Sequence, residues 1–133
     1  MDTNVLSEIR KGKKCDLNVR NWWVKTGEDQ IYLSVMVLGE VRRGIDKLGD
    51  RNPEKTQHLE DWLEAVLERF GGRVLTIDEN DANTWGSMTV KRALPLVDGL
   101  LAATAKAHRI TFVTRNTKDI DDLEVDHLNP FES

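Results

Sequence analysis

The chain has 133 residues, of which 39% are hydrophobic and 32% are charged, and its formal net charge is −4. This composition predicts a soluble protein with one domain, residues 1–133, built on a single buried core. No apolar run reaches the roughly 18 residues that would cross a membrane. The single cysteine, Cys15, excludes an internal disulfide and a cysteine-based zinc site and is typical of the cytoplasm. Because the net charge is negative, a nucleic acid would have to bind to local basic patches.

The first half of the chain is predicted to be mainly helical. Residues 4–11 and 16–26 have helical patterns, and residues 31–34 form a short apolar run typical of a buried strand. A helix is expected from this strand to about Leu48. The clearest helix begins at 52–54, and its apolar residues have helical spacing: Leu59, Trp62, Leu63, Val66, Leu67 and Phe70.

The second half alternates strands and helices. Residues 73–77 are predicted to be a strand, and Asp78 is a good N-cap for the helix that follows. Residues 97–108 are predicted to be a helix, 110–114 a strand and 123–128 a weaker last strand. Alternation at this spacing predicts the α/β class, as a three-layer α/β/α sandwich with a central, mainly parallel sheet.

The start of the chain departs from this pattern. In such a fold Asp2 should end the first strand, yet only Met1 precedes it. Either residues of that strand come before Met1 in the natural gene product, or the strand is much shorter than usual. The first strand is therefore predicted to be truncated.

Four acidic residues lie at the edges of apolar segments: Asp2, Glu40, Asp98 and Asp119. Carboxylates at strand ends point into the crevice where open α/β sheets bind ligands. They repel one another unless a cation neutralises them, and oxygen ligands favour Mg²⁺ or Mn²⁺. Asp98 alone would fit equally well as a charge that caps a helix. The four together predict a metal site, whose commonest use is phosphodiester hydrolysis.

Polar residues flank these carboxylates. Thr3, Asn4, Thr114 and Asn116 are candidates to orient a carboxylate or a metal-bound water, although local turn bonding is an equal alternative for the two asparagines. Arg115 is a candidate contact to phosphate.

The sequence resembles PIN-domain proteins of the VapC toxin type, including their FitB-like relatives. Single pieces such as Asp-Thr-Asn are weakly specific, but the ordered set is strong and runs through the whole chain. The segments that carry it are residues 2–8, 33–40 with Gly44, 97–105, 113–119 and 128–131.

The resemblance implies an Mg²⁺- or Mn²⁺-dependent endoribonuclease that acts on RNA, is usually a homodimer, and is blocked by a cognate antitoxin. Asp2, Glu40 and Asp98 match the first three acidic residues of the family. Many relatives have aspartate where this chain has Asn116, whereas others pair asparagine there with an acidic residue three positions on, here Asp119. The alternative is a PIN-like module that acts by binding proteins or nucleic acids without turnover.

Other chemistries have less support. A haloacid-dehalogenase-like phosphatase needs a second aspartate two positions after the first, where this chain has Asn4, and a response-regulator receiver needs an acceptor aspartate at the end of a middle strand. The histidines pair with no nucleophile. We interpret His108 as a charge that compensates the dipole at a helix C-terminus.

Overall fold

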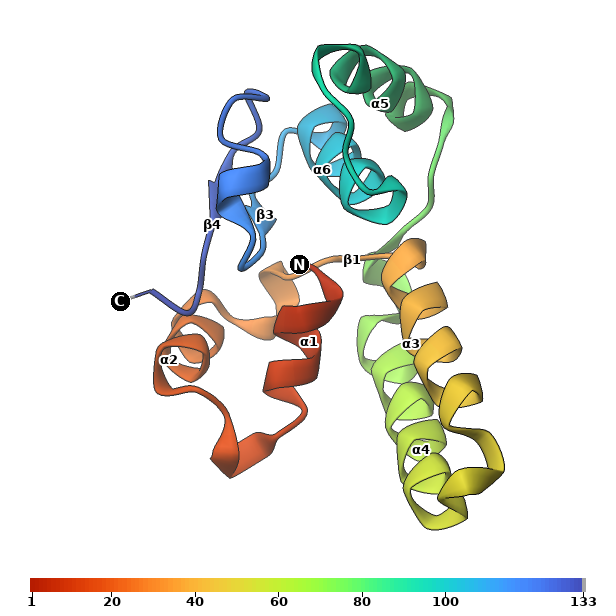
Figure 1. The fold of residues 1–133 in the computed structure, drawn as a ribbon. Helices are drawn as coiled ribbons and strands as arrows, with labels where there is room; N and C mark the ends of the chain where they lie inside the picture. Colours follow the sequence, from red (N-terminus) through yellow and green to blue (C-terminus); the bar gives the residue numbers. More distant parts are fainter. Residues whose placement is uncertain (133) are drawn as a thin grey trace.

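The structure, a computed structural model, describes residues 1–132 and is mostly helical (Figure 1). No helix in this part of the chain is both long and apolar enough to cross a membrane. The helices are α1 (Thr3–Ile9), α2 (Leu17–Thr26), α3 (Val35–Leu48), α4 (Pro53–Phe70), α5 (Glu79–Lys91) and α6 (Leu96–His108). The strands are β1 (Leu33–Ser34), β2 (Val74–Leu75), β3 (Phe112–Val113) and β4 (His127–Leu128).

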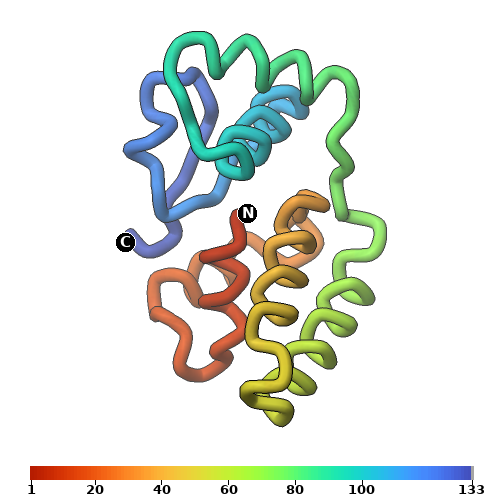
Figure 2. The backbone as a smooth tube through the Cα atoms, turned by 45° about the vertical axis from the view of Figure 1, so that its right-hand side comes forward, coloured from red at the N-terminus to blue at the C-terminus, as the bar shows by residue number. Residues whose placement is uncertain are grey.

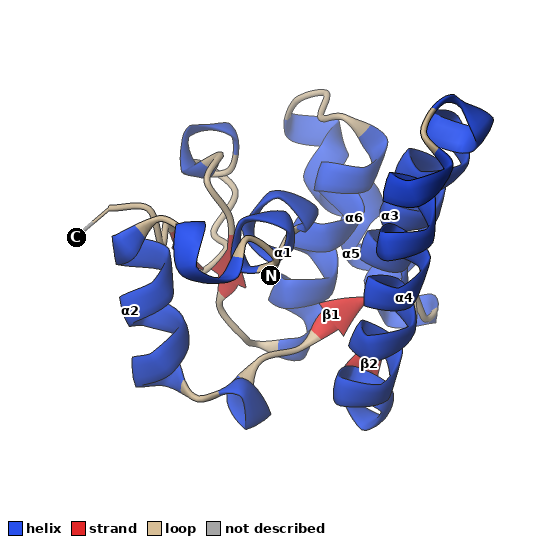
Figure 3. Ribbon diagram, turned by 90° about the horizontal axis from the view of Figure 1, so that it is seen from below, coloured by secondary structure: helices blue, strands red, loops and turns tan. Residues whose placement is uncertain are grey.

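The strands form two small parallel sheets. β1 pairs with β2, with Leu33 opposite Val74, and β3 pairs with β4, with Phe112 opposite His127. Figure 3 shows the short strands among the much larger helices. The predicted strands and their parallel direction are confirmed, although each strand has only two residues. The single central sheet of a three-layer sandwich is not confirmed, since residues 1–132 form two separate sheets.

The N-terminus lies between the two sheets (Figure 1). The Met1 ammonium donates to the Tyr32 carbonyl at 3.0 Å, and the Asp2 N–H donates to the Val113 carbonyl at 2.9 Å. These two residues touch both sheets but are too few to form a ladder that would join them. A cavity of about 460 Å³ lies beside them, and its lining includes Met1, Trp22, Ile31, Tyr32, Ile110 and Leu128.

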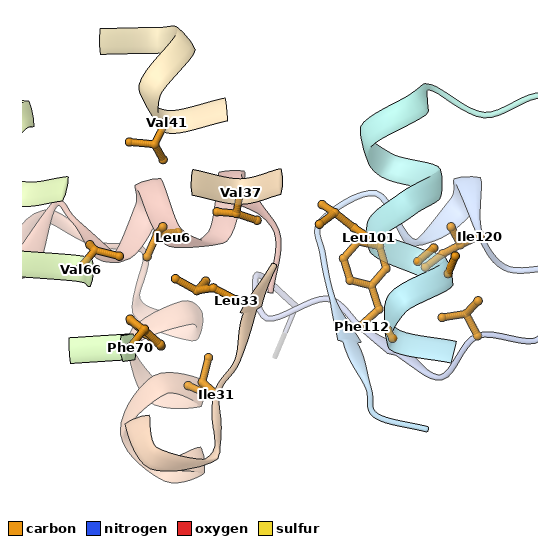
Figure 4. Packing of buried hydrophobic residues seen from close by; sticks show 14 of the residues in the cluster. Leu6, Ile31, Leu33, Val37, Val41, Val66, Phe70, Leu101, Phe112 and Ile120 are labelled. Atoms are coloured by element: carbon orange, nitrogen blue, oxygen red, sulfur yellow. The ribbon is translucent and has the colours of Figure 1, made fainter. Parts of the chain in front are cut away.

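Most buried hydrophobic side chains belong to one cluster, which includes residues of both sheets. Figure 4 shows one group of side chains around Leu33 and a second around Leu101 and Phe112. All of them are at least nine-tenths buried, and burial of each large aliphatic or aromatic side chain contributes about 1.5–3 kcal/mol. Each group holds nearby helices in place. The labelled residues of the first group are Leu6, Ile31, Leu33, Val37, Val41, Val66 and Phe70, and those of the second are Leu101, Phe112 and Ile120.

The helices pair into two hairpins, α3 with α4 and α5 with α6, which Figure 2 shows on different sides of the N-terminus. Helix α4 begins as predicted, because the Asn52 side chain accepts a hydrogen bond from the Lys55 N–H at 3.1 Å and Pro53 occupies the first turn. Not every apolar residue with helical spacing on α4 is buried. Leu67, at the edge of the stripe, remains 44% exposed.

Candidate metal centre

Asp2 is buried and is held by hydrogen bonds to both carboxylate oxygens. It is the N-cap of α1, where its Oδ1 accepts from the Val5 N–H at 3.0 Å. Its Oδ2 accepts from the Thr114 hydroxyl at 2.6 Å, and the Thr114 hydroxyl oxygen in turn accepts from the Asn116 N–H at 3.1 Å. The end of β3 and the start of α1 thus fix one carboxylate between them.

Glu40 lies in the second turn of α3 and faces α1. The Thr3 hydroxyl donates to Glu40 Oε1 at 2.5 Å. Helix α3 starts directly after β1, where Ser34 is the N-cap and its hydroxyl oxygen accepts from the Met36 N–H at 3.0 Å. The predicted role of Thr3 as a contact that orients a carboxylate has this hydrogen bond in its favour.

Asp98 lies in the first turn of α6 and is partly exposed. Burial raises the pKa of its carboxyl, and the charges of Glu40, Asp2 and Asp119 raise it further. Like charges raise a pKa in this way only when they are near. Asp98 therefore lies near three other carboxylates, which come from distant parts of the chain.

Asp98 is the acidic residue in the first turn of α6, as the helix-terminus alternative predicts, but its side chain makes no capping hydrogen bond within residues 1–132. The N-cap position of α6 is Pro95, which makes no side-chain capping bond. Helix α6 is instead positioned by close packing on α5, because a Cβ at Gly99 would lie 3.2 Å from Trp85 Nε1. A side chain at position 99 would require the Trp85 ring to shift by a few tenths of an ångström.

Asp119 lies in the turn Thr117–Asp119 after β3 and is exposed. Arg115 and Asn116, which precede this turn, are exposed as well. The Arg115 guanidinium stacks over the Phe131 ring at 4.3 Å from its centroid, which places it on the last segment of the chain. Within residues 1–132 the side chains of Asn4 and Asn116 make no hydrogen bond, so their predicted orienting role has no contact in its favour.

The donors of this cluster are carboxylate oxygens, the ligands that Mg²⁺ and Mn²⁺ prefer. In the described part of the chain, no three of them bring ligand atoms within 4.8 Å of one another. The cluster has the donor chemistry of a hard-cation site.

A tighter group lies elsewhere. Asp78, Asp81 and His108 each offer one ligand atom, and these atoms lie within 4.8 Å of one another. Sequence reasoning identified Asp78 only as an N-cap and His108 only as a charge near a helix end. The sequence does show that Asp78 and Asp81 are three residues apart, a spacing that predicts a capping box. This spacing gives no indication that His108, on another helix, lies beside them.

The sequence is similar to that of a known protein family and to those of named relatives. The family model described as the PIN domain matches residues 1–125. Toxin FitB from Neisseria gonorrhoeae is 32% identical over 137 residues, covering 98% of this chain and 96% of that protein. The VapC ribonuclease Y4jK from Sinorhizobium fredii is 31% identical over 139 residues, covering 99% of this chain and 96% of its own length.

Solved structures agree with the sequence relatives. The crystal structure of FitAcB from Neisseria gonorrhoeae superposes with a TM-score of 0.88 at 32% identity, covering 99% of this chain and 97% of the matched chain. VapBC2 from Rickettsia felis, bound to a DNA fragment from its promoter, matches with a TM-score of 0.76 at 20% identity, covering 96% and 95%, which supports the fold alone. The chain therefore belongs to the PIN-domain family.

Proposed function

We propose that this protein is an Mg²⁺- or Mn²⁺-dependent endoribonuclease and the toxin of a toxin–antitoxin pair. The observation that carries the proposal is a contact between segments: Thr3, the residue after the buried Asp2, donates to Glu40 Oε1, which brings the start of α1 against α3. The raised pKa of Asp98, caused by burial and by Glu40, Asp2 and Asp119, indicates that this carboxylate lies near the others. The relatives named Toxin FitB and VapC ribonuclease support the reaction and the role. The family alone would not fix the activity, because folds host many functions.

The chain's residues fit a hard divalent cation. Asp2 and Asp98 are the proposed direct ligands, and Glu40 and Asp119 would hold waters or a second ion. When bound, Mg²⁺ or Mn²⁺ neutralises the carboxylates, makes the attacking water more acidic and faces the charge that develops on the phosphoryl oxygens. These four residues are the proposed catalytic residues.

Two threonines are proposed as positioning residues. The Thr114 hydroxyl holds Asp2 Oδ2, and the Thr3 hydroxyl holds Glu40 Oε1. Each bond restricts the rotation of a carboxylate, so that less conformational entropy is lost when the cation is bound. Rigid ligands also keep the reacting groups in line.

RNA would be held by a small number of cations. Arg42 is already engaged by Glu60 at 2.7 Å and Asp46 at 3.1 Å, so it is a poor candidate. Arg115 and Lys118 are exposed on the segment that carries Asp119 and are the proposed phosphate contacts. With a net charge of −4, RNA affinity should be modest and sensitive to salt.

Two exposed apolar surfaces suit protein partners. On α2, Leu17 is 70% exposed and Val24 is 72% exposed, and their spacing of seven residues places them on one face. Near the turn between α5 and α6, Val90 is 85% exposed and Leu96 is 59% exposed. We propose that an antitoxin and a second copy of this chain cover such surfaces.

The proposal also includes the cellular location of the protein and the arrangement of its sheet. A toxin that cleaves cellular RNA acts in the cytoplasm. The two small sheets would act as halves of the central parallel sheet of a three-layer sandwich, with the N-terminal residues between them.

The test is cleavage of labelled RNA by the purified chain with Mg²⁺, with Mn²⁺ and with excess chelator. We expect cleavage only with an added cation. Cleavage that survives the chelator would overturn the proposed chemistry. RNA binding without cleavage under every metal condition would favour the alternative, a PIN-like binding module.

The partner proposal is tested by co-expression with the small protein encoded beside it. Leu17→Glu combined with Val24→Glu should reduce co-purification of that protein, and Lys25→Glu is the matched exposed control on the same helix. Sedimentation of the purified chain tests the homodimer. A monomer at all micromolar concentrations would refute that part.

A further inference from the structure

A second cluster of ligating side chains lies at the open end of the α5–α6 hairpin. Asp78 and Asp81 stand at the start of α5, and His108 stands at the end of α6. One ligand atom from each lies within 4.8 Å of the other two. None of these residues belongs to the proposed nuclease site.

Asp81 carries a buried oxygen that makes no hydrogen bond within residues 1–132, although His108 lies at ion-pair distance from it. The side chain is 1% exposed, and its Oδ2 accepts from the Asp78 N–H at 3.1 Å. Its Oδ1 is buried and has no hydrogen-bond partner. An unsatisfied buried carboxylate oxygen destabilises a fold, so this atom points to a ligand that would satisfy it.

The neighbouring imidazole is placed as a second ligand would be. His108 Nε2 lies 3.4 Å from Asp81 Oδ1 without making a hydrogen bond to it. Nitrogen and oxygen ligands about 2.1 Å from one tetrahedral ion lie about 3.4 Å apart. The spacing of these two atoms therefore suits a metal ion between them.

The third ligand is also available. Asp78 Oδ1 accepts from the Asp81 N–H at 2.8 Å, and Asp78 Oδ2 accepts no hydrogen bond from any residue between 1 and 132. One imidazole nitrogen with two carboxylate oxygens is a donor set for Zn²⁺ with a fourth position open to water. Mg²⁺ prefers oxygen ligands and octahedral geometry, so it should bind here poorly.

We propose that Asp78, Asp81 and His108 bind a Zn²⁺ ion that fastens the start of α5 to the end of α6. The two helices pack side by side (Figure 1), and the turn through residues 92–95 already joins their other ends. Asp98 precedes His108 by ten residues on α6, which is about 15 Å along a helix. The ion therefore sits away from the nuclease centre, and the proposal does not depend on RNA cleavage.

The test is a titration of the metal-free chain with Zn²⁺, followed by calorimetry and by thermal unfolding. We expect binding of one ion at this cluster and an unfolding midpoint raised by several degrees. Asp78→Asn keeps the helix cap, since asparagine caps as well as aspartate. Asp78→Asn and His108→Gln should each weaken Zn²⁺ binding by more than about tenfold, because even indirect partners of metal ligands are worth that much.

Two controls locate the ion. His58→Ala removes an exposed histidine on α4 and should leave binding unchanged. Asp98→Asn alters the nuclease centre and should also leave the Zn²⁺ shift intact. Loss of the shift in Asp98→Asn, an unchanged affinity in His108→Gln, or no binding at micromolar Zn²⁺ would each overturn the proposal. The NMR shift of His108 Nε2 on Zn²⁺ addition gives a direct readout, and its absence in the wild type would also refute it.

Discussion

The two acidic regions of this protein differ in how they are assembled. The candidate metal centre draws Asp2, Glu40, Asp98 and Asp119 from four separate segments, whereas the α5–α6 cluster draws its side chains from two helix ends that already pack together. The first contains only carboxylates. The second includes an imidazole, whose nitrogen can ligate when neutral or balance the carboxylates when protonated.

The donor atoms of each cluster determine which cation it should prefer. In the candidate metal centre, burial and three neighbouring negative charges raise the pKa of Asp98. Without a cation, ionisation of the Asp98 carboxyl is therefore less favourable than it would be in water. A hard cation relieves that repulsion. At the α5–α6 end, Asp81 Oδ1 makes no hydrogen bond within the described residues and lies 3.4 Å from His108 Nε2, a mixed donor pair that we expect to prefer a borderline-soft cation. We therefore expect the two clusters to prefer different ions.

The largest effect should come from removing one ligand of the nuclease centre. Asp98→Asn keeps the shape but removes a ligand charge, so RNA cleavage should fall by more than about a hundredfold, since changes around metal ligands alone cost about 10- to 100-fold. Single-turnover cleavage with Mg²⁺ measures this. His58→Ala is the matched control and should cleave normally. Full activity of a clean Asp98→Asn preparation would remove Asp98 from the mechanism.

A smaller loss should follow from freeing Asp2. Thr114→Val removes the hydroxyl that donates to Asp2 Oδ2 while keeping the side-chain volume. We expect a 10- to 100-fold loss of cleavage, together with a higher Mg²⁺ concentration for half-maximal activity. Thr114→Ser should restore both. If Thr114→Val lowers activity with no change in the Mg²⁺ requirement, Thr114 is a structural residue and has no positioning role.

The α5–α6 end should respond through stability. Asp78→Ala removes the N-cap of α5 and should lower the free energy of unfolding by about 1 kcal/mol, whereas Asp78→Asn should change it by only a few tenths. Urea unfolding of the metal-free variants measures the difference. Equal losses in both variants would mean that the negative charge of Asp78, and not its capping bond, supports the helix.

The smallest effect concerns pH. Because the folded state raises the pKa of Asp98 above its ordinary value of 3.8, it holds that proton more tightly than the unfolded chain does. Stability from this group is therefore present at low pH and is lost as the pH rises through the raised pKa. Asp98→Asn should stabilise the metal-free protein at neutral pH by roughly 0.2–1 kcal/mol, as for partly solvated charges.

Urea unfolding between pH 4 and pH 7, without and with Mg²⁺, provides the measurement. Added Mg²⁺ should stabilise the wild type more than Asp98→Asn, since it neutralises the repelling carboxylates. An Asp98→Asn variant that is less stable than the wild type at neutral pH without metal would show that the carboxylates do not repel.

The local features of the chain could be predicted from its sequence because they depend on neighbouring residues. The helix that begins after Asn52, the N-cap at Asp78 and the helix ending at His108 all follow from spacing and capping chemistry. The four acidic positions could be identified because each lies at the edge of an apolar segment. Their catalytic roles stay predictions that the experiments above test.

Only the tertiary structure decided which distant groups meet. Two sheets form in place of one because residues 1 and 2 supply too few backbone bonds to join them. Thr114 reaches Asp2 across 112 positions in the chain, and His108 reaches Asp81 across the α5–α6 pair. Such contacts depend on how whole helices pack against one another. The spacing of hydrophobic residues within one segment shows which face is buried, but not which distant residue it meets.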